Sequence, residues 1–180
     1  MIDARRNRPI RAGVLTVSDR SHRGKRADES GPLLVRLLAT QLGADVAAQA
    51  VVPDDRARIA AHLIAWCDEL RLDLVVTTGG TGFAPRDVTP EAVRDVIERE
   101  APGLSEAIRA DGARKTPHAL LSRGVSGIRG RTLIVALPGS PNAVSEALPV
   151  LLPALPHAVE ILRDDPAADA HHAVREESAP

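Results

Sequence analysis

Residues Thr77–Val93 read TTGGTGFAPRDVTPEAV, and this stretch decides how the chain folds. It follows Leu72–Val76, a short run rich in β-branched residues that predicts a buried strand. The strand leads into the glycine-rich loop Gly79–Gly82. Signals for a helix start come next, with Thr89 as the N-cap, a proline at the first helical position and an acid in the first turn. The stretch therefore predicts a strand, a glycine loop and a helix in direct succession.

The glycine loop carries the first functional signal. Glycine permits positive φ and lets a ligand approach the main chain, and successive free N–H groups in such a turn form an anion site. A basic and an acidic side chain, Arg86 and Asp87, follow the loop. These features favour a site for a phosphorylated ligand. A tight turn between sheet and helix explains the glycines equally well, so the residues alone leave both interpretations open.

Strands and helices alternate along the rest of the chain. Alternation of this kind predicts an α/β fold with a mostly parallel sheet covered by helices on both faces. Apolar runs predict further strands at residues 11–17, 45–52 and 133–137. Helical periodicity and end signals predict helices from Ser30 to Gly43, from Pro53 to Leu70, at 90–98, at 102–113, from Ser140 to an interruption at Pro149, and at 154–163.

Polar groups follow two of the other predicted strands. Ser18, Asp19 and Arg20 come after the first strand, and Gly139 and Ser140 come after the last. If the second strand lies outside the first, the strand order begins 2-1-3 and reverses between strands one and three. Ligands of open α/β sheets bind at such a reversal, beyond the carboxyl ends of the strands. We therefore expect these loops to meet the glycine loop, with a helix N-terminus at Ser140 as a further anion contact.

Composition excludes several classes of function. Aromatic residues make up 1% of the chain, too few for the stacking platforms used to bind single-stranded nucleic acid. The net charge of −1 predicts no general affinity for polyanions. A single cysteine, Cys67, excludes an internal disulfide and any multi-cysteine metal site.

The ends of the chain and its apolar runs bear on domain organisation and localisation. Residues 1–9 are predicted to form a flexible basic arm, 10–163 the folded domain, and 164–180 a disordered acidic tail. The polar start shows no signal-peptide pattern, and the longest apolar run, Ala147–Leu155, is too short to span a bilayer. We therefore expect a cytoplasmic protein with no membrane partner. The apolar segment Ala147–Leu162 exceeds what one small sheet needs, which predicts a homo-oligomer.

The central stretch resembles one family closely. The pattern TTGGTG-x-x-x-RD-x-TP-E-A is similar to that of the MogA/MoaB family, the molybdopterin adenylyltransferases, which also occur as a domain of gephyrin. SDR at 18–20, PD at 53–54, LSR at 121–123 and LPGSP at 137–141 add to the resemblance, which covers roughly residues 10–163. It implies a three-layer α/β/α sandwich with one antiparallel strand, self-association into trimers and contact with other molybdenum cofactor enzymes.

The resemblance also implies an activity and a set of site residues. The activity is transfer of AMP from ATP to the terminal phosphate of molybdopterin, with release of pyrophosphate. Asp54 and Asp87 are the implied catalytic carboxylates and are expected to hold Mg²⁺ on the triphosphate. The residues expected to bind substrate or nucleotide are Ser18, Asp19, Arg20, Thr78, Gly79, Gly80, Thr81, Gly82, Arg86, Gly139 and Ser140.

Structural roles compete with these assignments. Asp54 could instead be an N-cap or first-turn acid of the helix that follows it, and Asp87 a turn acid or a partner of Arg86. At the level of the whole protein, a module that binds a pterin or scaffolds other enzymes without transferring AMP is the alternative function. The presence of both carboxylates favours the enzyme.

Overall fold

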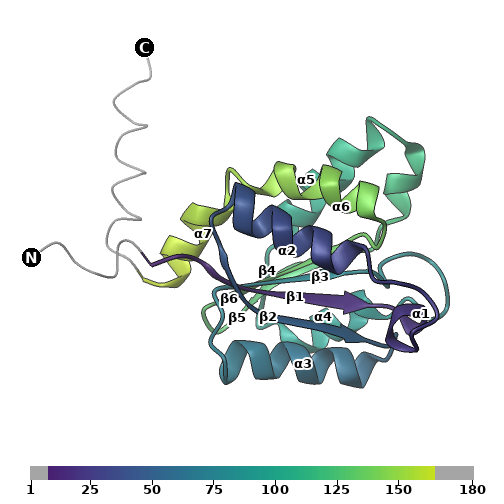
Figure 1. The fold of residues 1–180 in the computed structure, drawn as a ribbon. Helices are drawn as coiled ribbons and strands as arrows, with labels where there is room; N and C mark the ends of the chain where they lie inside the picture. Colours follow the sequence, from purple (N-terminus) through teal and green to yellow (C-terminus); the bar gives the residue numbers. More distant parts are fainter. Residues whose placement is uncertain (1–7, 165–180) are drawn as a thin grey trace, which may run out of the picture.

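The computed structural model describes residues 8–164 and contains a six-stranded sheet in the order β2-β1-β3-β6-β5-β4 (Figure 1). The strands are β1 Arg11–Val17, β2 Asp45–Val52, β3 Leu74–Thr78, β4 Arg99–Glu100, β5 Ser126–Arg129 and β6 Thr132–Leu137. The helices are α1 Asp19–His22, α2 Ser30–Gln41, α3 Arg56–Asp68, α4 Thr89–Val96, α5 Pro102–Ala113, α6 Pro141–Leu151 and α7 Leu155–Leu162, with a 3-10 helix at Pro117–Leu121. Residues 1–7 and 165–180, which hold most of the predicted arm and tail, lie outside the described residues.

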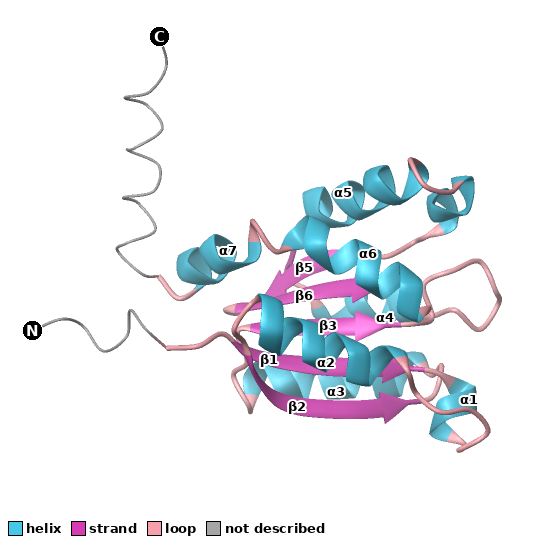
Figure 2. Ribbon diagram, turned by 45° about the horizontal axis from the view of Figure 1, so that its top comes forward, coloured by secondary structure: helices cyan, strands magenta, loops and turns pink. Residues whose placement is uncertain are grey.

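Helices cover both faces of the sheet. α2, α5, α6 and α7 lie on one face, and α3 and α4 lie on the other (Figure 2). Each face has its own aliphatic core, because alternate side chains of a strand point to opposite sides. Val14 and Val76 belong to the first core, and their neighbours Leu15 and Val75 belong to the second. This three-layer α/β/α arrangement confirms the predicted fold class.

The strand order confirms the predicted reversal. β1 pairs in parallel with β2 on one side and with β3 on the other, and β3 pairs in parallel with β6. β5 pairs antiparallel with β6 and with the short β4. The carboxyl ends of β1, β3 and β6 therefore lie at one edge of the sheet, and the order reverses between β1 and β3.

β5 is the one antiparallel strand that the family resemblance implied, but the residues themselves did not predict its position. It forms a hairpin with β6 through Gly130, whose φ is 54°. Glycine lowers the β-propensity of this strand, whose sequence is SGIR, so no alternation marks it. The glycine is nevertheless required, because a Cβ on Gly127 would lie 2.8 Å from the Arg99 carbonyl oxygen of the paired strand β4. Pairing with β6 and close packing against the segment after α4 therefore define this strand.

The predicted cap of the first long helix was wrong. Ser30 is the first residue of α2 and not its N-cap. Its hydroxyl instead donates a hydrogen bond across the molecule to the Gly139 carbonyl, at 2.7 Å. The Asp28 carboxylate accepts a hydrogen bond from the Gly31 N–H at 3.0 Å and so satisfies one of the free donors of the first turn.

Two other helix predictions also differ from the structure. Leu70 was assigned to a core stripe, but α3 ends at Asp68 and Leu70 is 42% exposed. Pro149 was expected to interrupt a helix, but α6 continues through it. The proline is exposed while Leu148 and Leu151 beside it are buried, so packing on the sheet compensates for the missing N–H.

The apolar side chains of α6 and α7 pack mostly into the core. Leu148, Leu151 and Leu155 are all fully buried against the sheet. Most of the segment on which the homo-oligomer prediction rested therefore stabilises the monomer. Within the described residues no single helix is long and apolar enough to cross a membrane. α6 and α7 could do so only together, judged by length and composition alone, and they are bent by 64° at their break.

A buried carboxylate lies at the other end of the sheet from the strand-end loops. Asp73 precedes β3, is 5% exposed and accepts hydrogen bonds from the Arg11 N–H at 2.8 Å and from the Arg163 guanidinium at 2.7 and 2.9 Å. Burial alone would raise the pKa of Asp73, but these donors and the nearby positive charges outweigh it and lower the pKa. Arg163 also donates to the carbonyls of Arg8 and Pro9, at 3.1 and 3.0 Å.

We expect Asp73→Asn to lower the free energy of unfolding at pH 7 by about 2 kcal/mol, because hydrogen bonds to a buried charge are weakened. Asp68→Asn is the matched control. Its carboxylate pairs with Arg129 at an exposed position, so its loss should change stability little. Urea denaturation of both variants measures the difference.

The same substitution should change the acid sensitivity of the fold. Because the pKa of Asp73 is lowered in the folded state, its contribution is present above the unfolded pKa of about 3.9. That contribution is lost as the pH falls through the folded-state pKa. The unsubstituted protein should therefore lose more stability than Asp73→Asn when the pH is lowered below about 4. If the free energies of unfolding of the two proteins fall in parallel as the pH is lowered, this account is contradicted.

Candidate functional site

The glycine loop begins with two residues in the left-handed region, Gly79 with φ 101° and Gly80 with φ 62°. A Cβ on Gly79 would lie 2.2 Å from the Val17 carbonyl oxygen, so only glycine fits between β3 and the end of β1. The predicted N-cap Thr89 is instead the first residue of α4. Its hydroxyl donates to the Gly79 carbonyl at 2.8 Å, and its N–H donates to the Gly80 carbonyl at 3.1 Å. The start of α4 therefore holds the loop in place.

The ends of β3 and β6 are joined directly. The Thr78 hydroxyl donates to the Pro138 carbonyl at 2.7 Å, and the Gly79 N–H donates to the Leu137 carbonyl at 3.3 Å. A Cβ on Gly139 would lie 2.9 Å from the Gly79 Cα atom. The loops after β3 and β6 thus touch through their backbones, as the sequence predicted for Gly79 and Gly139.

The loop after β1 joins them through α1. Ser18 caps this short helix by accepting a hydrogen bond from the Ser21 N–H at 3.2 Å. The Asp19 carboxylate forms an ion pair with the Arg86 Nε atom at 2.6 Å and lies 3.8 Å from Arg23. Burial alone would raise the pKa of Asp19, but the hydrogen bond and positive charge of Arg86 outweigh it and lower the pKa.

Asp54 does not cap the helix that follows it. The N-cap of α3 is Asp55, whose carboxylate accepts a hydrogen bond from the Arg58 N–H at 2.9 Å. Asp54 Oδ2 instead accepts one from the Asp19 N–H at 2.8 Å. The pKa of Asp54 is raised, mainly because burial disfavours the charged form, and the negative charges of Asp19 and Asp87 add to the effect. The hydrogen bond from Asp19 opposes the rise. The structural alternative for Asp54 is therefore not realised.

Asp87 is oriented by its own turn. Its Oδ2 atom accepts a hydrogen bond from the Ala84 N–H at 3.0 Å and would lie 2.8 Å from a Cβ on Gly82. It is a turn acid in this sense, but it does not pair with Arg86. The Arg86 guanidinium binds Asp19 and donates to the Asp54 carbonyl at 3.2 Å. Arg86 therefore braces the two loops that carry Asp19 and Asp54.

Arg123 holds several parts of the site together, although no role for it was predicted from the sequence. The side-chain Nε atom of Arg123 donates a hydrogen bond to the Gly82 carbonyl at 2.8 Å, and the backbone N–H of Arg123 donates one to the Thr81 carbonyl at 2.8 Å. The guanidinium also donates to the Asp87 carbonyl and forms an ion pair with Glu91 of α4. One side chain thus links the glycine loop, the catalytic candidate and the following helix. The LSR motif marked the position, but its partners are separated from it by more than thirty residues.

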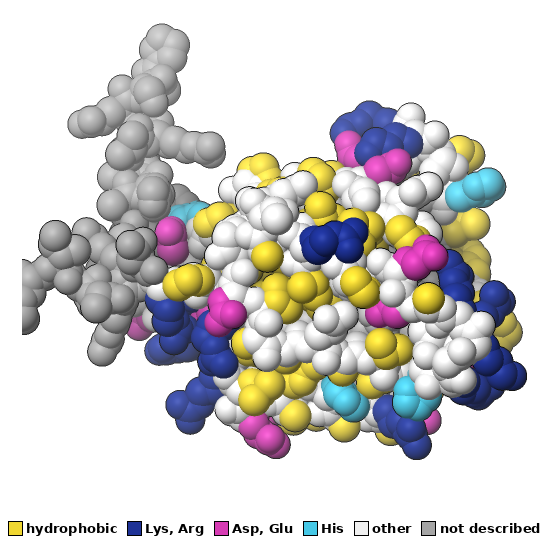
Figure 3. Space-filling model, viewed as in Figure 1, with side chains coloured by type: hydrophobic (Ala, Val, Ile, Leu, Met, Phe, Trp, Pro, Cys, Tyr) yellow, Lys and Arg dark blue, Asp and Glu magenta, His cyan; other side chains and the backbone are white. Residues whose placement is uncertain are grey.

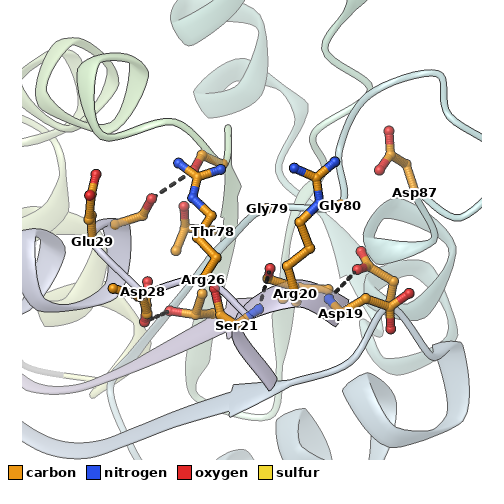
Figure 4. Close-up of a pocket in the computed structure, with 17 residues that line it drawn as sticks. Asp19, Arg20, Ser21, Arg26, Asp28, Glu29, Thr78, Gly79, Gly80 and Asp87 are labelled. Carbon is orange, nitrogen blue, oxygen red and sulfur yellow. Dashed lines mark hydrogen bonds between the residues drawn. The ribbon is translucent and has the colours of Figure 1, made fainter. Parts of the chain in front are cut away.

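Two cavities adjoin at these loops. The polar cavity, of about 340 Å³, lies beyond the ends of β1 and β3 (Figure 4). The apolar cavity, of about 510 Å³, lies between the glycine loop, α5, the 3-10 helix and α6. Both are lined by Gly80, Asp87 and Gly139. Of the predicted site residues, the polar cavity alone has Ser18, Asp19, Arg20, Asp54, Thr78 and Gly79, and the apolar cavity alone has Thr81, Gly82 and Ser140. Arg86 lines neither.

The carboxylates of Asp54 and Asp87 are the groups in this site that could bind a metal ion. Among residues 8–164, no group of three or more His, Cys, Asp or Glu side chains is arranged to hold a metal ion by itself. Asp54 and Asp87 both line the polar cavity, and each is oriented by one backbone N–H. A carboxylate has about four lone-pair sites, so each retains acceptors. Mg²⁺ is commonly bound by one or two carboxylates together with substrate phosphates, and this pair fits that pattern.

Comparison with known proteins agrees with this geometry. A family model described as "Probable molybdopterin binding domain" matches residues 13–157. The chain belongs to this family. A solved structure of the molybdopterin biosynthesis enzyme MoaB from Thermus thermophilus is 50% identical with a TM-score of 0.82, and the match covers 87% of this chain and 98% of that one. The resemblance to MogA/MoaB proteins is thereby confirmed, and it extends to the fold.

Curated members of the molybdopterin-binding domain family differ in length. Molybdopterin adenylyltransferase of Helicobacter pylori is 42% identical over 154 residues, which cover 85% of this chain and 88% of that protein. The molybdenum cofactor synthesis protein cinnamon of Drosophila melanogaster is 45% identical over 156 residues. The chain spans about a quarter of that relative, since the match covers 87% of this chain but 26% of the Drosophila protein.

The glycine loop of this molybdopterin-binding domain can be tested with a matched pair of substitutions. A Cβ on Gly80 would lie 2.5 Å from the Thr89 hydroxyl and 3.0 Å from Asp54 Oδ1, whereas Gly130, at φ +54°, has nothing within 4 Å. Gly130→Ala should cost about 1 kcal/mol from backbone strain alone. Gly80→Ala should cost more than that, and because the glycine loop is the predicted anion site it should also weaken the binding of ATP that the family resemblance implies. Thermal melting and calorimetric ATP titration measure both effects. If Gly80→Ala and Gly130→Ala lose the same stability and Gly80→Ala keeps its affinity for ATP, Gly80 is only a turn residue.

Proposed function

We propose that this chain transfers AMP from ATP to the phosphate of molybdopterin in molybdenum cofactor biosynthesis. The molybdopterin phosphate oxygen attacks the α-phosphorus of ATP. The bond from that phosphorus to the β-phosphate oxygen breaks, and pyrophosphate leaves with the bonding electrons. The similarity to the molybdopterin adenylyltransferase of Helicobacter pylori, which the match covers over 88% of its length, supports this activity.

The observation that carries the proposal is that two cavities meet at shared residues. Adenylyl transfer needs two phosphorylated substrates whose phosphates come together while their ring systems remain apart. The polar and apolar cavities share Gly80, Asp87 and Gly139, so ligands in both would meet at the glycine loop. A protein that only stored a pterin would need one cavity and no second phosphate site.

The residues at the junction have separate tasks. Backbone N–H groups of the glycine loop bind phosphate oxygens, and the Thr78 and Thr89 hydroxyls keep that loop from relaxing. Asp54 and Asp87 would hold Mg²⁺, which neutralises charge on the triphosphate when it is bound. The neighbouring acids that raise the pKa of Asp54 also make a cation favourable between them. Arg123 and Arg86 position the two carboxylates through their backbone carbonyls.

A non-catalytic pterin-binding or scaffold protein remains the alternative function. It is favoured if the protein binds molybdopterin but does not turn over ATP with it. Asp54 does not cap α3 and makes one contact to the Asp19 N–H at the start of α1, and Asp87 makes one contact within its own turn, so each carboxylate keeps acceptors that the fold does not use.

The paired carboxylates are tested by three single variants and one double variant. Asp54→Asn and Asp87→Asn should each lower the rate of formation of adenylylated molybdopterin by about 100-fold or more. The double variant should be little worse than the worse single variant, because the two residues act on one transition state. Asp55→Asn is the control, since asparagine caps a helix about as well as aspartate. Near-normal turnover by Asp54→Asn would refute the paired-carboxylate proposal and leave Asp87 as the single catalytic acid, whereas no turnover by the unsubstituted protein with ATP and molybdopterin would favour the scaffold function.

We also propose that the chain is cytoplasmic and forms a homo-oligomer, with a trimer as the expected state. Since α6 and α7 are largely buried in the monomer, the support now comes from other side chains. Phe83, Leu120 and Leu121 are 67%, 63% and 46% exposed, although each is large and apolar. Sedimentation of the full chain should give a mass above that of a monomer at micromolar concentration. Replacement of Phe83 and Leu120 by serine should shift that mass downward, and an unsubstituted monomer would refute the proposal.

A further inference from the structure

Two arginine side chains line the polar cavity together. Arg20 belongs to α1, and Arg26 lies in the loop between α1 and α2. Both extend in the same direction, Arg26 toward Thr78 and Arg20 toward Gly79 and Gly80 (Figure 4). Arg20 was predicted from the sequence to bind substrate or nucleotide, whereas no role was predicted for Arg26. Basic side chains also gather on this end of the molecule in the space-filling view (Figure 3).

These two guanidinium groups differ from the other arginines nearby. Arg23 and Arg86 both form ion pairs with Asp19. Within the part of the chain that the structure describes, neither Arg20 nor Arg26 has a hydrogen bond or ion pair from its side chain. Both therefore keep a full set of donors in the cavity.

The acid closest in sequence to Arg26 on the cavity wall is already engaged. Asp28 accepts hydrogen bonds from the Thr16 hydroxyl at 2.8 Å and from the Gly31 N–H at 3.0 Å, one on each carboxylate oxygen. These contacts hold Asp28 against β1 and α2. Four further carboxylates line the cavity, those of Asp19, Glu29, Asp54 and Asp87, but no hydrogen bond or ion pair joins either guanidinium group to them. Like charges held in one cavity repel, and a bound polyanion would reverse that repulsion.

We propose that Arg20 and Arg26 bind the pyrophosphate end of the triphosphate, with Arg26 as a contact to the leaving group. Arginine presents a planar fork of donors that matches two phosphate oxygens, and successive phosphates of a polyphosphate can occupy two such forks. The inference rests on the proposed function, because pyrophosphate is the group that the transfer releases.

The proposal also gives the reaction a direction through the site. The α-phosphate lies at the junction formed by Gly80, Asp87 and Gly139, and the leaving pyrophosphate extends into the polar cavity over the arginines. In-line displacement places the attacking oxygen opposite the leaving oxygen, so the molybdopterin phosphate approaches from the apolar cavity. Negative charge that develops on the departing oxygen is then closest to the two guanidinium groups.

The test is binding of inorganic pyrophosphate, which needs no turnover. Calorimetric titration in EDTA removes any contribution from a metal bound to the carboxylates. Arg26→Gln should weaken pyrophosphate binding about tenfold or more, because a charge-assisted, bidentate contact is lost. AMP, which lacks the β- and γ-phosphates, should bind Arg26→Gln and the unsubstituted protein about equally.

Lys25→Gln is the matched control. It removes the same charge from the adjacent residue, which does not line either cavity. Lys25→Gln should leave pyrophosphate affinity within about twofold, since only the long-range field changes. Both residues are exposed, and equal melting temperatures would verify that the variants are folded.

The outcomes separate this inference from the proposed function. Pyrophosphate affinity that is insensitive to Arg26, or equally sensitive to Lys25, would overturn the inference even if AMP transfer is intact. Failure of the unsubstituted protein to bind pyrophosphate would overturn it as well. Arg26-dependent pyrophosphate binding without any formation of adenylylated molybdopterin would support the polyphosphate site and refute the proposed transfer.

Discussion

The site depends on backbone approaching backbone where β1, β3 and β6 end. A Cβ on Gly79 would lie 2.2 Å from the Val17 carbonyl, and a Cβ on Gly139 would lie 2.9 Å from Gly79. No rotamer change can relieve such contacts, because a Cβ position is fixed by the main chain. Only glycine at these two positions lets the three loops converge, and their convergence brings the glycine loop and the two carboxylates Asp54 and Asp87 to one cavity. The hydroxyls of Thr78 and Thr89 then fix the loops by bonding to main-chain carbonyls.

Charge around the converged loops is arranged in opposing pairs. Arg86 neutralises Asp19, and Arg123 neutralises Glu91, so these ion pairs hold the framework. Asp54 has no such partner, and its raised pKa reflects burial beside other acids. Asp19 and Glu91 are thus paired with guanidinium groups, while Asp54, which lines the polar cavity, is not paired with a cation. A site of this kind gains most when a cation and a polyanion bind together.

Local signals in the sequence predicted most of the fold and much of the candidate site. The strand, glycine loop and helix at 72–93 were recognisable because each depends on residues close in sequence, whereas the 2-1-3 strand order was assumed and only the structure establishes it. β5 was missed because its stability comes from pairing with β6. The bracing role of Arg123 was missed for a related reason, since its contacts at Gly82, Asp87 and Glu91 are set by tertiary structure. The capping roles of Ser30, Asp54 and Thr89 were wrongly predicted or left open because cap residues compete with more distant partners for the same side chains.

The carboxylate of Asp73 has a topological consequence. Through Arg163 it holds the last described helix beside Arg8 and Pro9, so the chain enters and leaves the domain at one point (Figure 1). That point lies at the amino-terminal edge of β1 and β3, a full strand length away from the glycine loop. A domain with adjoining ends can be inserted or appended in a larger polypeptide without spreading its sheet or crossing its cavities. The fold is thus suited to serve as one domain of a larger protein. The Drosophila relative carries such a matching segment within a much longer chain.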